Sequence, residues 1–97
     1  QAVRSMTDIH WTRHASANFE RAALWLATKD IRAAQKLVDD VDRAILLLAE
    51  HPSAAKESDV PGVRVLTLRR LPWSIYYRVD ERSVVILAVR HQARTSP

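Results

Sequence analysis

The stretch WSIYYRVDERSVVILAVR, residues 73–90, decides the fold because its two halves have the patterns of two neighbouring strands. In a strand, successive side chains point to opposite faces. One face of residues 73–79 therefore carries Trp73, Ile75, Tyr77 and Val79, and the other carries Ser74, Tyr76 and Arg78. Residues 80–83 are polar and of hairpin length, and the β-branched, apolar run 84–90 follows them. The stretch predicts an antiparallel hairpin.

A third strand is predicted upstream, over residues 63–70. Val65 and Thr67 interleave with Leu66 and Leu68, so both faces carry apolar groups, as in a central strand. The pair Leu71-Pro72 then forms a tight connection, since proline at a strand edge removes no ladder hydrogen bond. Residues 53–61 are polar and are interpreted as a loop. The strands 63–70, 73–79 and 84–90 thus form a meander.

Two helices are predicted before this meander. Ser16 can cap the first, which ends near residue 28 and places on one face Phe19, Ala22, Ala23 and Leu26. Asp30 can cap the second, whose apolar stripe contains Ala34, Leu37, Val38, Val41, Ala44, Ile45 and Leu48. The pair His51-Pro52 ends it, because proline cannot donate the next helical hydrogen bond. The short joint near residue 29 predicts an antiparallel helical hairpin.

A short N-terminal strand completes the predicted fold. Over residues 9–12, Ile9 and Trp11 alternate with His10 and Thr12, as in a half-buried strand. The elements together predict an α+β fold, in which the antiparallel helical hairpin packs on one face of an antiparallel sheet. The chain leaves the opposite sheet face uncovered, so an aromatic group there, such as Tyr76, is a candidate for contact with a partner.

The composition predicts one small domain. Ninety-seven residues with 47% hydrophobic content can form one core but not two. The longest apolar runs, 44–49 and 84–89, are far shorter than the ~20 residues of a membrane span, so none is predicted. Cysteine is absent, which excludes disulfides and thiolate zinc sites and fits a reducing cytoplasm. We interpret residues 1–5, before Met6, as a remnant of cloning.

The positive charge is concentrated in the C-terminal part of the chain. Residues 1–59 hold eight Lys or Arg against nine Asp or Glu, whereas residues 60–97 hold seven Arg against two acids. Guanidinium groups suit carboxylates and phosphates, so this part could face an anionic partner. Any single arginine among them can equally be a solvated charge on an exposed strand position.

The C-terminal half also carries a recognisable pattern: the string RRLPWSIYYRVDE at residues 69–81, the apolar run 84–89, His91 and Arg94. It resembles the C-terminal half of toxins of the ParE/RelE superfamily, which belong to type II toxin–antitoxin systems. The earlier part is compatible, so the resemblance spans about residues 8–94. It implies that residues 6–97 form a single ParE/RelE-like toxin domain.

The superfamily implies two activities on one fold: RelE-like members cleave messenger RNA on the ribosome, and ParE-like members inhibit DNA gyrase. Three departures favour the ParE-like branch. Ser74 stands where RelE-like nucleases typically carry an arginine, and serine cannot supply the fixed charge that a phosphorane needs. The tail 93–97 lacks an aromatic side chain on which a base could stack. Lys56 alone stands in the loop where nucleases carry a lysine cluster.

The resemblance and the alternation together nominate residues for contact with the antitoxin or the target: Arg69, Arg70, Tyr76, Arg78, Arg90, His91 and Arg94. Tyr77 is assigned to the core and Tyr76 to the exposed face of the same strand. His91 could shuttle a proton if the chain is a nuclease; otherwise it is a strand-end histidine bonded to backbone. The strand register decides which arginines share a face.

Neither a metal nor another cofactor is predicted. His10 and His14 have the i,i+4 spacing of helical metal ligands, but they straddle the strand 9–12 and the turn before Ser16. No third ligand accompanies them, which a zinc site would require.

The sequence therefore predicts a cytoplasmic toxin that inhibits DNA gyrase and has no membrane partner. A cognate antitoxin, ParD-like and encoded adjacently, would neutralise it by wrapping its apolar groove. The alternative is a ribosome-dependent endoribonuclease of the RelE type, with the ribosome and messenger RNA as partners. A third possibility is a toxin fold that has lost toxicity and serves only as a binding module.

Overall fold

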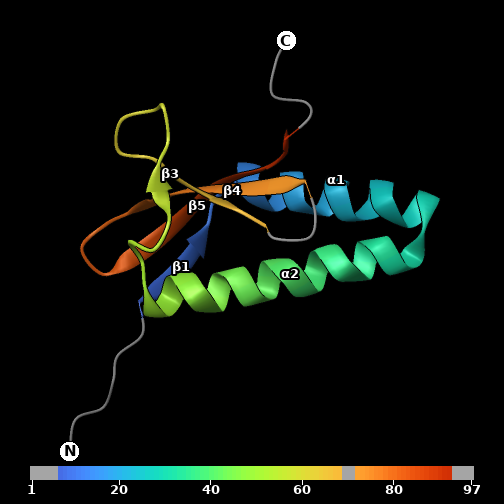
Figure 1. Cartoon of the computed structure of the whole chain (residues 1–97), viewed down its shortest axis with the longest axis horizontal. Helices are drawn as coiled ribbons and strands as arrows, with labels where there is room; N and C mark the ends of the chain where they lie inside the picture. Colours follow the sequence, from blue (N-terminus) through green and yellow to red (C-terminus); the bar gives the residue numbers. More distant parts are fainter. Residues whose placement is uncertain (1–6, 69–71, 93–97) are drawn as a thin grey trace, which may run out of the picture.

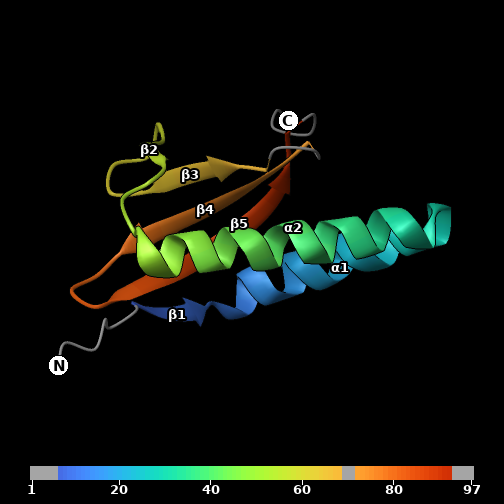
Figure 2. The ribbon, with the colours of Figure 1, turned by 60° about the horizontal axis from the view of Figure 1, so that its bottom comes forward.

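The computed structural model describes residues 7–68 and 72–92, and these form a helical hairpin on a five-stranded sheet. The elements in chain order are β1 Asp8–Trp11, α1 Arg13–Lys29, α2 Ile31–Glu50, β2 Lys56–Glu57, β3 Arg64–Thr67, β4 Trp73–Val79 and β5 Ser83–His91. The two helices lie against one face of the sheet, and the turn between them projects beyond the strands (Figures 1 and 2). The predicted α+β architecture is confirmed, but the sheet is mixed and not wholly antiparallel as predicted, because β1 runs parallel to β5.

The sheet has the order β1-β5-β4-β3-β2, which puts β4 in the middle. The meander from β3 to β5 is antiparallel as predicted, and β1 adds a parallel strand beside β5, with Ile9 opposite Val84. Residues 63–70 were predicted to have the character of a central strand, and β3 does have a neighbour on each side, but β4 occupies the middle of the sheet. Because β1 occupies the far side of β5, the 73–90 hairpin moves to the centre, and only the two-residue β2 lies outside β3. That short strand lies within the predicted loop 53–61.

Thr12, not Ser16, caps α1. The Thr12 Oγ1 accepts a hydrogen bond from the Ala15 N–H at 3.0 Å, which satisfies one of the unpaired donors of the first turn. The Ser16 N–H already donates to the Thr12 carbonyl, so Ser16 lies inside the helix. The predicted cap of α2 is confirmed, since Asp30 Oδ1 accepts from the Arg32 N–H at 3.0 Å. His51 ends α2, also as predicted.

The core lies between the two helices and the strands β4 and β5. Its largest fully buried side chains are Tyr77, Leu37, Leu48, Ile75, Ile86, Val41 and Val84. Tyr77 was correctly assigned to the core, but Val79 is 39% exposed, so the buried face of β4 ends at Tyr77. The register between β4 and β5 skips Leu87, because Tyr76 pairs with Ala88 while Tyr77 pairs with Ile86. This irregularity lets both strands keep their apolar side chains on the helix side.

No helix within residues 7–68 and 72–92 combines the length and apolar content that crossing a membrane requires.

Candidate functional site

The sheet face opposite the helices carries most of the described residues that the sequence nominated. Paired residues of neighbouring strands share a face, so the register identifies this open face. It comprises Asp8 and His10 on β1, Val65 and Thr67 on β3, Ser74, Tyr76 and Arg78 on β4, and Val85, Ala88 and Arg90 on β5. Tyr76 is half-buried there, and Arg78 and Arg90 are exposed.

Tyr76 and Arg90 form a contact on the open face. The Arg90 guanidinium carbon lies 6.0 Å from the centroid of the Tyr76 ring. A guanidinium over an aromatic face is attracted by the ring quadrupole and is held in one orientation. The structure therefore presents a flat, oriented donor group beside a partly exposed ring, which suits contact with a carboxylate or another planar group on a partner.

Arg78 is engaged differently from Arg90. Its Nη1 pairs with Asp80 Oδ1 at the start of the β4–β5 loop, and both side chains are about half exposed. The neighbouring carboxylate offsets the charge of Arg78. Of the nominated arginines, Arg69, Arg70 and Arg94 lie outside the described residues, so Arg90 and Arg78 are the two whose places are known.

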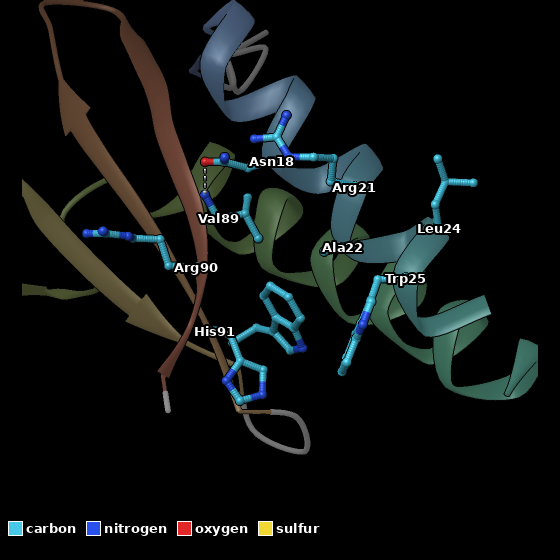
Figure 3. Close-up of a pocket in the computed structure, with 9 residues that line it drawn as sticks. Asn18, Arg21, Ala22, Leu24, Trp25, Val89, Arg90 and His91 are labelled. Carbon is cyan, nitrogen blue, oxygen red and sulfur yellow. Dashed lines mark hydrogen bonds between the residues drawn. The ribbon is translucent and has the colours of Figure 1, made fainter. Parts of the chain in front are cut away.

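His91 lies on the other side of the sheet from Tyr76 and Arg90. It pairs in register with Trp73, and the two rings meet edge to face, with centroids 5.0 Å apart and planes at 81°. Trp73 is buried on the helix side. In Figure 3, Arg90 points away from α1, whereas His91 extends to the side of β5 on which Trp25 lies. The register therefore places His91 and the nominated arginines on opposite faces of the sheet, although Arg90 and His91 both border one groove at the end of β5.

Sequence reasoning missed a groove between α1 and the end of β5. This α1–β5 groove has a volume of about 470 Å³ and is lined by Asn18, Arg21, Ala22, Leu24, Trp25, Trp73, Val89, Arg90 and His91. It exists because β1 pairs with β5 only as far as Ile86. Beyond that point, the Asn18 side chain replaces the missing strand, and its Oδ1 accepts from the Val89 N–H at 3.3 Å.

Two exposed apolar side chains form the helical wall of this groove. Leu24 is 68% and Trp25 is 45% exposed, and Lys29 Nζ lies 5.4 Å from the Trp25 ring centroid. A signal was present in the sequence, because both residues fall off the predicted apolar stripe of the first helix. Large apolar residues on the solvent side of a helix indicate a contact surface.

A second groove runs between α2 and β3. This α2–β3 groove has a volume of about 680 Å³ and is lined by Asp40, Arg43, Ala44, Leu47, Leu66, Thr67 and Leu68. Asp40 is not part of the predicted apolar stripe of the second helix, yet it is only 9% exposed. Asp40 lies three residues after buried Leu37 and four before buried Ala44, and this spacing could have placed it on the buried face of α2.

The buried Tyr77 hydroxyl fixes the segment after α2. It donates to the Pro52 carbonyl at 2.8 Å and accepts from the Ala55 N–H at 3.3 Å, and Arg64 Nη1 donates to the Ala55 carbonyl at 2.7 Å. Burial raises the pKa of Tyr77 above its usual value, since the phenolate would lose its hydration; the Ala55 hydrogen bond and the Arg64 charge partly offset this. These contacts make Tyr77 a structural residue.

His10 and His14 do not form part of a metal cluster in the described part of the chain. No group of three His, Cys, Asp or Glu side chains gathers there closely enough to hold an ion. The Thr12 cap separates the two histidines, with His10 on β1 and His14 on α1.

Comparisons with known proteins agree with this architecture. Residues 9–95 match the family model of the ParE toxin of the type II toxin–antitoxin system, parDE. A Sinorhizobium fredii protein named Putative toxin Y4kP is 30% identical over 89 residues, which cover 92% of each chain.

Two solved structures have a similar fold. A structure of the chromosomal ParDE TA system from P. aeruginosa matches with a TM-score of 0.77 and 31% identity, over 89% of this chain and 96% of that one. The toxin–antitoxin complex RelBE2 from Mycobacterium tuberculosis matches with a TM-score of 0.65 and 20% identity, over 96% and 99%. The family match spans nearly the whole chain, so this protein belongs to the ParE toxin family of type II toxin–antitoxin systems.

Proposed function

We propose that this ParE-family protein inhibits DNA gyrase and is neutralised by a ParD-like antitoxin. Its identity to the chain of the ParDE system is 31%, against 20% for the RelBE2 chain, which supports the fold alone. Both similar structures are toxin–antitoxin systems by their descriptions, which favours a protein antitoxin as one partner. The target contact is assigned to the open face, with Tyr76 and Arg90 at its centre.

The observation that carries this choice is the position of His91 on the sheet face opposite the Tyr76–Arg90 contact and Arg78. Acid–base cleavage of RNA needs a proton-transferring group and a charge-stabilising group within hydrogen-bond reach of one reacting phosphate. Here the His91 ring packs on Trp73 on the helix side, while Arg90 and Arg78 lie on the open face. Among the described residues, this arrangement favours a docking surface over a nuclease site.

A paired assay tests the proposal. Purified protein is added to a gyrase supercoiling reaction and, separately, to a translation extract in which cleavage of ribosome-bound messenger is followed. We expect inhibited supercoiling and intact messenger. Messenger cleavage that is abolished by His91→Ala, with supercoiling unaffected, would instead establish the RelE-type alternative. Activity in neither assay, together with harmless overexpression, would indicate a fold that has lost toxicity.

Variants of the open face test its role. Arg90→Ala and Tyr76→Ala should each weaken gyrase inhibition at least tenfold, because the exposed ring and the charge above it are removed. Arg82→Ala is the matched control, since it removes another exposed arginine, which lies in the loop before β5. If all three variants inhibit equally well, the open face is not the target contact.

A further inference from the structure

The α1–β5 groove differs from the α2–β3 groove in the charge of its lining. The α2–β3 groove contains the carboxylate of Asp40. The described lining of the α1–β5 groove contains no Asp or Glu, but it includes two indoles and three basic residues, Arg21, Arg90 and His91. Its volume of about 470 Å³ lies within the usual range of ligand sites. The α1–β5 groove therefore has the composition of a site for an anionic ligand with an aromatic ring.

Trp25 gives this groove an aromatic wall that a planar ligand can reach. The Trp25 side chain is 45% exposed, and Leu24 beside it is 68% exposed. Covering an exposed indole with a flat, apolar ring removes aromatic surface from water and adds a stacking contact. Nucleobases are such rings, and stacking on aromatic side chains is a common way to hold a single strand. Trp25 therefore favours a base as the aromatic part of the ligand.

Arg21 places a positive charge one helical turn before Trp25. The two residues are four positions apart on α1, so their Cβ atoms lie about 5–6 Å apart on one face of the helix. In Figure 3, the Arg21 side chain extends toward Asn18, while Trp25 lies farther along α1. A guanidinium group matches the geometry of a phosphate and binds it through paired hydrogen bonds. One nucleotide can thus place its base on Trp25 and its phosphate on Arg21.

The two basic residues of β5 contribute unequally to the groove. The Arg90 guanidinium points away from α1 and lies 6.0 Å from the Tyr76 ring centroid on the open face. His91 extends to the side of β5 on which Trp25 lies, with its ring centroid 5.0 Å from that of Trp73. An imidazole N–H can donate to a phosphate or to the edge of a base. Arg21 and His91 are therefore the donors that face the ligand, one from each wall.

The edge of β5 inside the groove is already capped, which disfavours an added peptide strand as the occupant. β1 pairs with β5 only as far as Ile86. Beyond that point, the Val89 N–H is bonded to Asn18 Oδ1 at 3.3 Å. A peptide that continued the β1 ladder would have to displace this bond, because strand addition depends on main-chain hydrogen bonds. A ligand held by stacking and phosphate contacts leaves it in place.

We propose that the α1–β5 groove binds single-stranded nucleic acid, with one base stacked on Trp25 and its phosphate bound by Arg21. The chemistry required is an unpaired base joined to a phosphodiester, which DNA and RNA share. The groove lies on the other side of β5 from the Tyr76–Arg90 contact, so binding there does not depend on gyrase as the target.

Titration of the purified protein into a labelled strand of about 12 thymidines tests this site. Fluorescence anisotropy should show binding that weakens from about 50 to about 200 mM salt, because phosphate contacts release counterions. Trp25→Ala should weaken the affinity roughly tenfold through lost stacking. Arg21→Gln should lower the slope of log affinity against log salt by about 0.7, as expected for one lost phosphate contact. Arg32→Gln, which removes an exposed arginine outside both grooves, is the matched control and should leave affinity and slope nearly unchanged.

Tryptophan fluorescence identifies the stacked residue. The chain has three tryptophans, and stacking of a base on Trp25 should quench its emission. Trp25→Phe keeps an aromatic ring, so this variant should retain most of the affinity but lose most of the quenching. The melting temperature of each variant, measured by circular dichroism, shows whether a loss of affinity reflects a loss of fold. Arg21 is exposed, so Arg21→Gln should melt with the parent.

A comparison of ligands separates the sources and the alternatives. Tighter binding of oligothymidine than of oligouridine would assign the site to DNA, and the reverse would assign it to RNA. A duplex of the same length should bind more weakly than either, because its bases are paired. Polyglutamate that binds as tightly as the oligonucleotides would show that charge alone is recognised and would overturn the inference.

Two further results would also overturn it. One is the absence of binding at low salt, and the other is an affinity that neither Trp25→Ala nor Arg21→Gln changes. These titrations contain no gyrase, so a protein that fails to inhibit supercoiling can still bind the strand, and the two failures are distinguishable.

Discussion

Tyr76 and Tyr77 are neighbours in sequence and have the same chemistry, yet they lie in opposite environments. Tyr77 is fully buried under α2 and uses its hydroxyl to hold Pro52 and Ala55. Tyr76 is half-buried on the open face, with Arg90 above its ring. The alternation of a strand separates them, so one face of β4 stabilises the protein and the other is available to a partner.

The largest expected difference is in unfolding free energy. Tyr77→Ala removes a buried aromatic ring and should cost about 3–5 kcal/mol, a large share of the stability of a domain this small. Tyr76→Ala should cost about 1 kcal/mol or less, as at a surface position. Urea unfolding followed by circular dichroism measures both. Equal losses would mean that the two faces do not differ in this way.

A smaller effect isolates the Tyr77 hydroxyl. Tyr77→Phe keeps the ring but leaves the Pro52 carbonyl and the Ala55 N–H without their partner. A buried polar group left unpaired costs about 1–3 kcal/mol. Tyr76→Phe is the matched control and should change the unfolding free energy little. A Tyr77→Phe variant as stable as the parent would show that water replaces the hydroxyl.

The parent protein and the Tyr77→Phe variant should also differ in how their stability depends on pH. Because the pKa of Tyr77 is raised in the folded protein, its contribution to stability is complete below the unfolded pKa of about 10 and falls as the pH rises toward the folded value. The unfolding free energy of the parent should therefore decline more between pH 9 and 11, a range set roughly around that value, than that of Tyr77→Phe. Parallel pH profiles would contradict the raised pKa.

The stability of α1, one of the two helices on the sheet, depends on its N-terminal cap. Thr12→Ala should destabilise the protein by about 1 kcal/mol, because the Ala15 N–H loses its acceptor. Ser16→Ala lies inside α1 and should have almost no effect. Thermal unfolding of the two variants distinguishes the observed start of α1 from the predicted one. A larger loss of stability for Ser16→Ala than for Thr12→Ala would favour the predicted cap.

The smallest effect is expected on the open face. Arg78→Ala breaks an exposed ion pair with Asp80, and such pairs contribute about 0–1 kcal/mol. The unfolding free energy should change by less than about 0.5 kcal/mol at physiological salt. A loss comparable to that of Thr12→Ala would show that this face also supports the fold.

The helices and the hairpin were predictable because their signals are local. The apolar stripe of α2, its Asp30 cap and the period of two in β4 depend on residues only a few positions apart. The cap of α1 was misplaced because Thr12 and Ser16 are both good capping residues, and the place where β1 ends decides between them. The central position of β4 was missed because β1 comes from the far end of the sequence to pair with β5.

The binding surfaces were only partly predictable. Tyr76 and Arg90 were nominated from alternation and resemblance, but their contact needed the register across β4 and β5. His91 was grouped with the arginines, and the register places it on the other face beside Trp73. Both grooves escaped sequence reasoning, because each has walls from a helix and a strand far apart in the chain.

The sequence by itself determined both helices, four of the five strands, their order and the alternation that makes Tyr77 a core residue, because hydrophobic period acts within a few residues. Only the tertiary structure decided which side chains converge. The pairing of β1 with β5, the skipped Leu87 and the two grooves between helices and strands depend on contacts between distant segments, and no local pattern encodes those.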